Sequence, residues 1–313
     1  MTTGSIQHIA IIGFGEAGGI LAADLAKQGI DVSVFDILLH SKLHRQAMLS
    51  KAQRCGVRAA PNLAACLRGA ELVISAVTAS SALDVAKKAG PILQPGQLFL
   101  DINSVSPATK RKAAEHVERR ATKKSRPHFV EAAVMSPFPG QRLKVPMLLG
   151  GPHAVDASAR LCSLGMNPSA LSYQLGVASA VKMCRSVVIK GLEALVVECL
   201  FAARRFGAED AVLESLATTY PSMGWQEDLP DYLISRVAEH GRRRAAEMRE
   251  VSQALRRVGV EPAMAMATAQ RQDDLVCESA KRGLRYDASK PFSWRAQADA
   301  LLPHARARRK KTA

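Results

Sequence analysis

The sequence predicts an α/β protein in which a doubly wound parallel sheet in the N-terminal part is followed by an all-α C-terminal domain. Two observations predict this architecture. Up to about residue 150, short apolar segments rich in β-branched residues alternate with helical stretches, as in βαβ units whose sheet is covered on both faces. After about residue 170 the strand patterns stop and helical patterns continue. We therefore expect two domains, at residues 1–170 and 171–313.

The expected elements follow from the apolar periodicity and the turn residues between them. Strands are predicted at residues 8–13, 31–36, 56–59, 71–77, 98–103, 128–135 and 147–151. Helices are predicted between them at residues 16–28, 41–54, 61–68, 80–89 and 107–120. The second domain is expected to hold one long helix at 176–206 and further helices near 208–218, 228–238, 240–258, 263–281 and 291–302.

The formal net charge of +15 comes from two visible sources, residues 110–126 and a tail from about residue 304 that we expect to be disordered. Basic segments can bind nucleic acid or attract anionic substrates. No aromatic residues are interleaved with these charges, which weakens a role in single-strand binding. The favoured interpretation is a solvated helix face and a free tail, with a nucleic-acid-associated protein kept as an alternative.

Several features favour a cytoplasmic location. No apolar run approaches the roughly 20 residues of a membrane span, and the N-terminus lacks the basic segment of a signal peptide. The six cysteines form no CxxC pair, and we expect them to be reduced thiols in the core. No group of His, Cys and Asp residues has metal-ligand spacing, so no metal is expected.

The first motif with chemical meaning is a glycine-rich turn between the first strand and the first helix. Its residues are Gly13, Phe14, Gly15, Glu16, Ala17 and Gly18. In a GxGxxG turn the first glycine allows the tight bend, the second lets a pyrophosphate approach the backbone, and the third lets the helix pack on the strand. The helix N-terminus then presents N–H groups to the phosphates. The motif therefore predicts a Rossmann domain that binds a nicotinamide dinucleotide.

Asp36 indicates which dinucleotide is bound. It ends the second predicted strand, eighteen residues after Gly18. A carboxylate at this place accepts hydrogen bonds from the ribose diol of NAD and repels the 2′-phosphate of NADP. The next three residues bring no cation, whereas Lys42 and Arg45 follow shortly and weaken the preference. We expect NAD as the cofactor, with NADP possible.

Four further segments recur in the order found in the β-hydroxyacid dehydrogenases. They are Ala76-Val77-Thr78, DINSVSP (101–107), FVEAAVMSPFPG (129–140) and GVASAVKMC (176–184). Over residues 8–270 the chain resembles this family, which includes 3-hydroxyisobutyrate, tartronate-semialdehyde and 6-phosphogluconate dehydrogenases. It is most similar to the branch with a phosphogluconate dehydrogenase-like C-terminal domain. The resemblance implies NAD(P)-dependent hydride transfer to or from a small hydroxy acid, cofactor contacts from Ala76, Val77 and Thr78, and a homodimer.

The same resemblance implies that Lys182 is the catalytic lysine, because Gly176 and Lys182 match the spacing of the family's GxxxxxK stretch. A lysine on an otherwise apolar helix is costly unless it is paired or functional. The alternative is a lysine whose long stem carries its charge to solvent. Ser186 stands where the family has an asparagine, so it is a candidate substrate contact.

Other substrate contacts are expected from two loops that follow predicted strands. Asn103 and Ser104 occupy the family's substrate loop, and both side chains can donate to a carboxylate. Capping of the next helix is the alternative role, although Ser106 already suits that position. Ser136 lies where the family has a Ser-Gly-Gly turn. Pro137 replaces a glycine there and removes a backbone N–H.

The family's second lysine, which pairs with the substrate carboxylate, is missing from this chain. One turn before its place stands EHGRRR (239–244), and His240 and Arg244 are the candidates to supply the missing positive charge. The alternative is a basic, solvated helix face.

Three other functions stay open besides a dehydrogenase that acts on a small anionic substrate. One is an imine or opine-type reductase of the same fold, against which Lys182 argues because known imine reductases often lack that lysine. The others are a non-enzymatic dinucleotide-binding regulator and the nucleic-acid-associated protein mentioned above.

Overall fold

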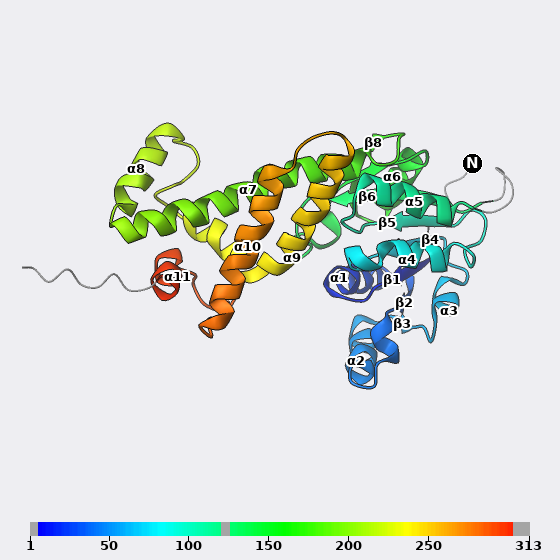
Figure 1. Ribbon diagram of the computed structural model, residues 1–313. Helices are drawn as coiled ribbons and strands as arrows, with labels where there is room; N and C mark the ends of the chain where they lie inside the picture. The colour runs from blue at the N-terminus through cyan, green and yellow to red at the C-terminus, as the bar shows by residue number, and fades with distance from the viewer. Residues whose placement is uncertain (1–5, 120–125, 303–313) are drawn as a thin grey trace, which may run out of the picture. The chain divides into compact units, whose positions relative to one another are not determined.

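The computed structural model describes residues 6–119 and 126–302 (Figure 1). The chain divides into two compact units, Met1–Met183 and Cys184–Ala313. The division lies inside a long helix, later than the boundary predicted after residue 170. The later boundary arises because a strand at 167–172 pairs with the sheet and the start of that helix is hydrogen-bonded to it. The basic tail predicted from about residue 304 lies outside the described residues, as does part of the basic segment 110–126.

The first unit is built on one sheet, and the prediction of a mainly parallel sheet is confirmed. The strands are β1 (His8–Ile12), β2 (Asp31–Phe35), β3 (Arg58–Ala59), β4 (Leu72–Ser75), β5 (Leu98–Asp101), β6 (His128–Val134), β7 (Pro146–Gly150) and β8 (Asn167–Ser172). Their order in the sheet is β3-β2-β1-β4-β5-β6-β7-β8. All neighbouring pairs are parallel except β6 with β7.

Helices cover both faces of this sheet because successive residues of a strand point to opposite sides. In β1, Ile9 and Ile11 belong to the core formed with α1 (Glu16–Ala26), α2 (Arg45–Cys55) and α6 (Ala154–Ser163). Ala10 and Ile12 belong to the opposite core, formed with α3 (Leu63–Leu67), α4 (Ala79–Ala89) and α5 (Pro107–Val117). The nearly continuous apolar strands of the sequence are therefore buried on two sides.

The second unit is helical. It contains most of α7 (Val177–Phe206), then α8 (Glu209–Thr219), α9 (Leu229–Arg257), α10 (Ala263–Lys281) and α11 (Trp294–Leu301). The predicted break between residues 238 and 240 is wrong, because α9 continues through Gly241. A Cβ on Gly241 would lie 2.5 Å from Cγ2 of Val276 and 2.9 Å from the carbonyl oxygen of Gln272 on α10. Gly241 thus allows close helix packing and does not end a helix.

Two further expectations need correction. Helix α6 and strand β8 were not predicted, and β8 is a mostly exposed edge strand that contains a proline, so its apolar pattern is weak. The cysteines were expected in the core, but only Cys66 is buried and four of the six are exposed. Burial raises the pKa of the Cys66 thiol to about 11. Among the described residues, no helix has the length and apolar character of a membrane span.

Candidate functional site

The glycine-rich turn joins β1 to α1, and a ligand can approach its backbone at Gly15. Gly13 has φ +92°, and a Cβ there would lie 2.3 Å from the carbonyl oxygen of Ala76. A Cβ on Gly18 would lie 1.9 Å from the carbonyl oxygen of Gly13. At Gly15, by contrast, a Cβ would meet no atom within 4 Å, and α1 begins there with no side-chain cap. The open side of Gly15 and the uncapped helix N-terminus fit a dinucleotide pyrophosphate.

Asp36 holds this turn against the end of β2. Its Oδ2 atom accepts a hydrogen bond of 2.7 Å from the backbone N–H of Phe14, and its Oδ1 atom accepts one of 2.9 Å from the N–H of Leu38. The carboxylate is therefore a structural link as well as the expected ribose contact. It retains acceptor capacity, since a carboxylate can accept about four hydrogen bonds.

Lys51 of α2 is a site residue that the sequence did not reveal. Its ammonium group donates to the carbonyl oxygens of Phe14 and Gly15, both at 2.7 Å, and lies 4.5 Å from the centre of the Phe14 ring. These contacts fix the turn from the side of α2 and place a positive charge beside it. Lys51 belongs to no motif, so only the packing of α2 identifies it.

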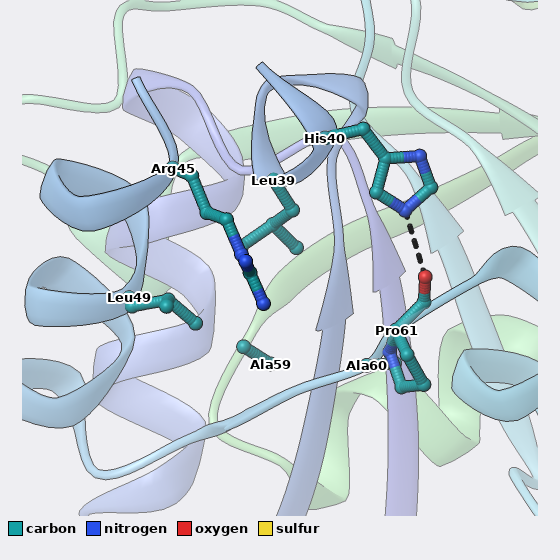
Figure 2. A pocket seen from close by; sticks show the side chains of 7 residues that line it. All are labelled: Leu39, His40, Arg45, Leu49, Ala59, Ala60 and Pro61. Atoms are coloured by element: carbon teal, nitrogen blue, oxygen red, sulfur yellow. Dashed lines mark hydrogen bonds between the residues drawn. The ribbon is translucent and has the colours of Figure 1, made fainter. Parts of the chain in front are cut away.

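A cavity of about 460 Å³ lies at the carboxyl ends of β2 and β3 (Figure 2). The side chain of Arg45 points into it from α2. On the other side, the Nε2 atom of His40 is 2.8 Å from the carbonyl oxygen of Pro61 and joins the turn after β2 to the loop after β3. In dinucleotide-binding sheets the adenine ribose lies just beyond the end of the second strand. The cavity therefore suits the adenosine end of the cofactor and adds a cation to it.

Asn103 connects the loops that follow β4 and β5. Its Oδ1 atom accepts from the N–H of Val77 at 2.7 Å, and its Nδ2 atom donates to Ser75 Oγ at 2.9 Å and to Asp101 Oδ1 at 2.6 Å. The side-chain amide is buried, and both its oxygen and its nitrogen are hydrogen-bonded within the protein. Asn103 therefore holds the two loops together. The half-buried Ser104 beside it is the better candidate to contact a substrate.

Lys110 shows that the basic segment 110–126 is not wholly a solvated face. Its ammonium group lies 3.1 Å from Oδ1 of Asp101 and donates to the carbonyl oxygen of Asp101 at 2.7 Å. Both side chains are 1% exposed. This buried ion pair supports the loop that carries Asn103, whereas Arg111 and Lys112 are exposed as expected.

Glu131 attaches the beginning of α7 to the sheet. This fully buried side chain of β6 accepts hydrogen bonds from the N–H groups of Gly176 at 2.6 Å and Ala178 at 3.2 Å, and from the hydroxyl of Ser179 at 2.8 Å. A carboxylate is stabilised there because the first turn of a helix presents unpaired N–H groups and the positive end of the dipole.

Lys182 follows Ser179 by three residues, so the two lie on adjacent turns of one helix face. The expected catalytic lysine is half-buried and lies in the first unit, on the turn of α7 next to the Glu131 contacts. Ser136 is also half-buried in this unit, in the loop after β6. In the sequence, a single acidic residue within the apolar run HFVEAAV was the signal that could have revealed Glu131.

The remaining candidates belong to the second unit, and Arg244 there already has an anionic partner. It forms two hydrogen bonds with the buried carboxylate of Glu193 on α7, one of them 2.9 Å between Nε and Oε2. Its charge is thus compensated within the helical unit. His240 lies 3.2 Å from Glu239, and burial followed by the charge of Arg236 lowers the pKa of His240. Ser186 is half-buried on α7.

Arg244 belongs to a buried polar network that the sequence did not predict. Beside it Lys190 of α7 pairs with Glu247 of α9, and Gln272 of α10 donates to Oε2 of Glu193 at 3.2 Å. Burial is the main cause that lowers the pKa of Lys190 and raises the pKa of Glu193. The signal for this network was a lysine and a glutamate, three residues apart, in the middle of an apolar helix.

Comparison with known proteins supports the dinucleotide-binding fold of the first unit. Residues 8–136 match the NAD binding domain of 6-phosphogluconate dehydrogenase, and residues 203–275 match a domain of unknown function, DUF1932. A conserved hypothetical protein from Sinorhizobium meliloti is 33% identical with a TM-score of 0.76, and the match covers 95% of this chain and 97% of that one.

Two further relatives indicate the family. A conserved protein of unknown function, described as structurally similar to 3-hydroxyacid dehydrogenases, is 31% identical with a TM-score of 0.68 over 85% of this chain and 97% of that one. The 3-hydroxyisobutyrate dehydrogenase of Pseudomonas aeruginosa is 28% identical over 72% of this chain and 73% of its own length. The fold is also shared with a Streptomyces aurantiacus imine reductase, at 18% identity and a TM-score of 0.55.

The chain thus combines an NAD-binding Rossmann domain with a helical C-terminal domain. The chain belongs to the β-hydroxyacid dehydrogenase-like family.

Proposed function

We propose that this protein is an oxidoreductase that transfers a hydride between a nicotinamide dinucleotide and a small hydroxy acid, with Lys182 as the general acid and base. The observation that supports this most is the attachment of α7. Three hydrogen bonds to Glu131 hold the helix start against β6, the strand next to β5 in the sheet, and Lys182 lies on the adjacent turn. The lysine is thereby held close to the sheet that carries the dinucleotide motif.

The residues present suit the cofactor. The turn at Gly13–Gly18 and the N-terminus of α1 would hold its pyrophosphate, and Asp36 with the cavity beside Arg45 would hold its adenosine end. NAD is favoured because Asp36 offers a carboxylate to the ribose diol, while Arg45 makes NADP the alternative. When bound, the cofactor accepts or donates the hydride.

The protein's own residues then handle the proton and the acid group of the substrate. The neutral amine of Lys182 accepts the proton of the substrate hydroxyl as the alcohol is oxidised, and its ammonium form returns a proton in the reverse direction. Ser104 and Ser136 lie in the loops after β5 and β6 and can donate hydrogen bonds to a carboxylate. This arrangement favours a small anionic substrate.

Replacement of Lys182 tests the proposal. After a screen of 3-hydroxy acids and aldonates with NAD and NADP has found a substrate, Lys182→Met should lower turnover by roughly 10²–10⁴. Dinucleotide affinity should stay nearly unchanged. Lys182→Arg should restore little, because arginine keeps its proton at working pH. The matched control is Arg185→Ala, an exposed cation of the same helix, which should stay close to the wild type. Near-normal turnover in Lys182→Met would contradict this mechanism.

An imine reductase is the second candidate, and the loop after β6 is the observation that favours it. Pro137 supplies no N–H where a carboxylate would need donors, which favours a less acidic substrate. The screen therefore includes cyclic imines with both cofactors. Imine reduction that survives in Lys182→Met, without any hydroxy acid oxidation in the wild type, would favour this second function.

A further inference from the structure

Gly19 is a glycine of α1 that the dinucleotide motif does not require. It follows the last glycine of the GxGxxG turn, is buried inside the helix, and does not have a positive φ. Alanine is more favourable than glycine in a helix interior. A Cβ on Gly19 would lie 2.7 Å from Nζ of Lys51 and 2.8 Å from its Cε atom. The missing side chain therefore makes room for the end of Lys51.

The positive charge of Lys51 is not neutralised within the protein. Its ammonium group donates only to the carbonyl oxygens of Phe14 and Gly15, and in the part of the chain that the structure describes it forms no ion pair with a carboxylate. The side chain is half-buried, and a partly buried charge is costly unless it is compensated. The exposed Glu16 opens α1 and adds a negative charge where a pyrophosphate is expected. The charge of Lys51 opposes that repulsion.

The contacts of Lys51 also orient the peptides that a pyrophosphate would meet. The C=O and N–H groups of a trans peptide point in opposite directions. Since the carbonyls of Phe14 and Gly15 are held toward Lys51, the N–H groups of Gly15 and Glu16 point away from it. From β2, Asp36 accepts the N–H of Phe14 at 2.7 Å. The turn is thus held in place before a ligand binds, and such preorganisation raises affinity.

We propose that Lys51 and Gly19 form a matched pair that raises the affinity for the pyrophosphate shared by NAD and NADP. The inference rests on the proposed function only in taking a dinucleotide as the ligand. Lys51 is a positioning residue that fixes two carbonyl oxygens and offsets the charge of Glu16, and Gly19 leaves the space that Lys51 needs. The pair therefore sets the affinity for both dinucleotides, whereas Asp36 and Arg45 affect the choice between them.

Titration of the full-length protein with NADH and NADPH, followed by the fluorescence of the nucleotide, tests the role of Lys51. Lys51→Met should weaken both dinucleotides by the same factor, roughly tenfold. Arg54→Met removes an exposed cation of the same helix and is the matched control, with unchanged affinity expected. Should Lys51→Met not fold, Lys51→Gln removes the charge and keeps a donor, and it should also weaken both.

Two results of this titration would contradict the proposal by itself. They are unchanged affinity in the folded Lys51 variant, and a loss confined to one of the two dinucleotides. A wild type that binds neither dinucleotide would overturn the proposed function together with this inference, so the two failures are distinguishable.

Gly19→Ala separates positioning from stability. Its Cβ would displace the flexible end of Lys51 and keep the fold, so both dinucleotides should bind roughly three- to tenfold more weakly. The midpoint of urea unfolding should equal or exceed that of the wild type, because alanine favours the helix. The double variant with Lys51→Met should bind no more weakly than Lys51→Met alone, since both changes remove the same contacts.

The matched control for this substitution is Gly191→Ala, in the interior of α7. A Cβ there would meet no atom closer than 3.8 Å outside its own helix and chain neighbours, so dinucleotide affinity should not change. Wild-type affinity in Gly19→Ala, or losses that add in the double variant, would overturn the pairing of Gly19 with Lys51.

Discussion

Asp36 follows the end of β2, where the ribose of a dinucleotide is expected, and Arg45 lines the cavity at that end of the sheet. The carboxylate of Asp36 is fixed by the N–H groups of Phe14 and Leu38, and the guanidinium of Arg45 points into the neighbouring cavity. The first group favours a ribose diol, and the second could pair with a phosphate. Cofactor choice therefore depends on which of two nearby, opposite charges contributes more.

Substitution of these two residues should shift cofactor choice in opposite directions. We expect Asp36→Ala to weaken NAD binding about tenfold, since it removes an acceptor of charged hydrogen bonds and releases the turn at Phe14. Arg45→Ala should weaken NADP binding and leave NAD binding nearly unchanged. Fluorescence titrations with both dinucleotides give the affinities. A wild type that prefers NADP tenfold or more, a difference of about 1.4 kcal/mol, would show that our interpretation of Asp36 is wrong.

His128 makes the stability of the first unit sensitive to mild acid. The rings of His128 and His153 lie 3.9 Å apart between centroids, and Nδ1 of His128 and Nε2 of His153 are buried without partners among the described residues. Burial, and then the charge of His153, lowers the pKa of His128, although Glu118 and Asp156 oppose this. The fold thus favours neutral His128. Its contribution to stability is complete above the ordinary pKa of about 6.5 and is lost as the pH falls through the lower pKa of the folded state.

The corresponding measurement is the free energy of unfolding in urea from about one pH unit above the ordinary histidine pKa to about 1.5 units below it, that is, between about pH 7.5 and pH 5. We expect the wild type to lose stability toward pH 5 and His128→Phe to lose less. The exposed histidine variant His44→Phe is the matched control, and its pH dependence should follow the wild type. Identical pH profiles for wild type and His128→Phe would contradict this prediction.

At the scale of elements, the start of α7 depends on a single side chain from another element. Glu131 of β6 receives two backbone N–H groups and the hydroxyl of Ser179. Ordinary helix caps are local, whereas this one is 45 residues away from Gly176. The contact therefore determines both where the helix begins and how its first turns, including that of Lys182, lie on the sheet.

Removal of this cap should affect turnover more than cofactor affinity. Glu131→Ala leaves buried N–H groups unsatisfied, so we expect a loss of about 2–3 kcal/mol in the free energy of unfolding. Turnover should fall because Lys182 is no longer held in place. Glu131→Gln keeps one acceptor oxygen, so its stability and its turnover should both lie between those of the wild type and those of Glu131→Ala. Urea denaturation and steady-state kinetics give the comparison. Full turnover in a destabilised Glu131→Ala would mean that the cap stabilises the fold without positioning Lys182.

At the scale of the whole molecule, one face of α7 remains apolar and open to solvent. Val188, Leu195 and Phe206 are 69%, 55% and 86% exposed, and Cys199 between them is exposed as well. Their spacings of seven, four and seven residues align them along one stripe of the helix. Apolar stripes of this kind usually mark interfaces. We therefore predict that this stripe forms the interface of the homodimer implied by the resemblance to the β-hydroxyacid dehydrogenases.

We expect a homodimer that buries this stripe. Leu195→Glu should give a monomer because it introduces a charge into an apolar interface. Val155→Glu, at an equally exposed apolar position on α6, is the matched control and should leave the assembly intact. Light scattering at micromolar concentration measures the mass. A monomeric wild type, or a dimer that persists in Leu195→Glu, would contradict this assignment of the interface.

Much of the first unit could be predicted because its signals are local. Each buried strand is a short apolar run, and the glycine turn encodes its own backbone conformation within six residues. Elements with weak local signals were missed. Strand β8 is exposed and contains a proline, and the continuity of α9 through Gly241 becomes clear only from α10, against which that glycine packs.

The amino-acid sequence alone predicted most of the strands and helices, the dinucleotide motif, the candidate lysine and the family. These properties depend on residue types at fixed, short spacings, which periodicity and motifs record. Contacts between separate elements revealed that Asn103 joins the loops after β4 and β5, that Lys110 is paired in the core, that Glu193 neutralises Arg244, and that Glu131 caps α7. Each of these depends on which side chains meet across separate elements, and a polar residue looks the same in a sequence whether its partner is solvent, substrate or another buried charge.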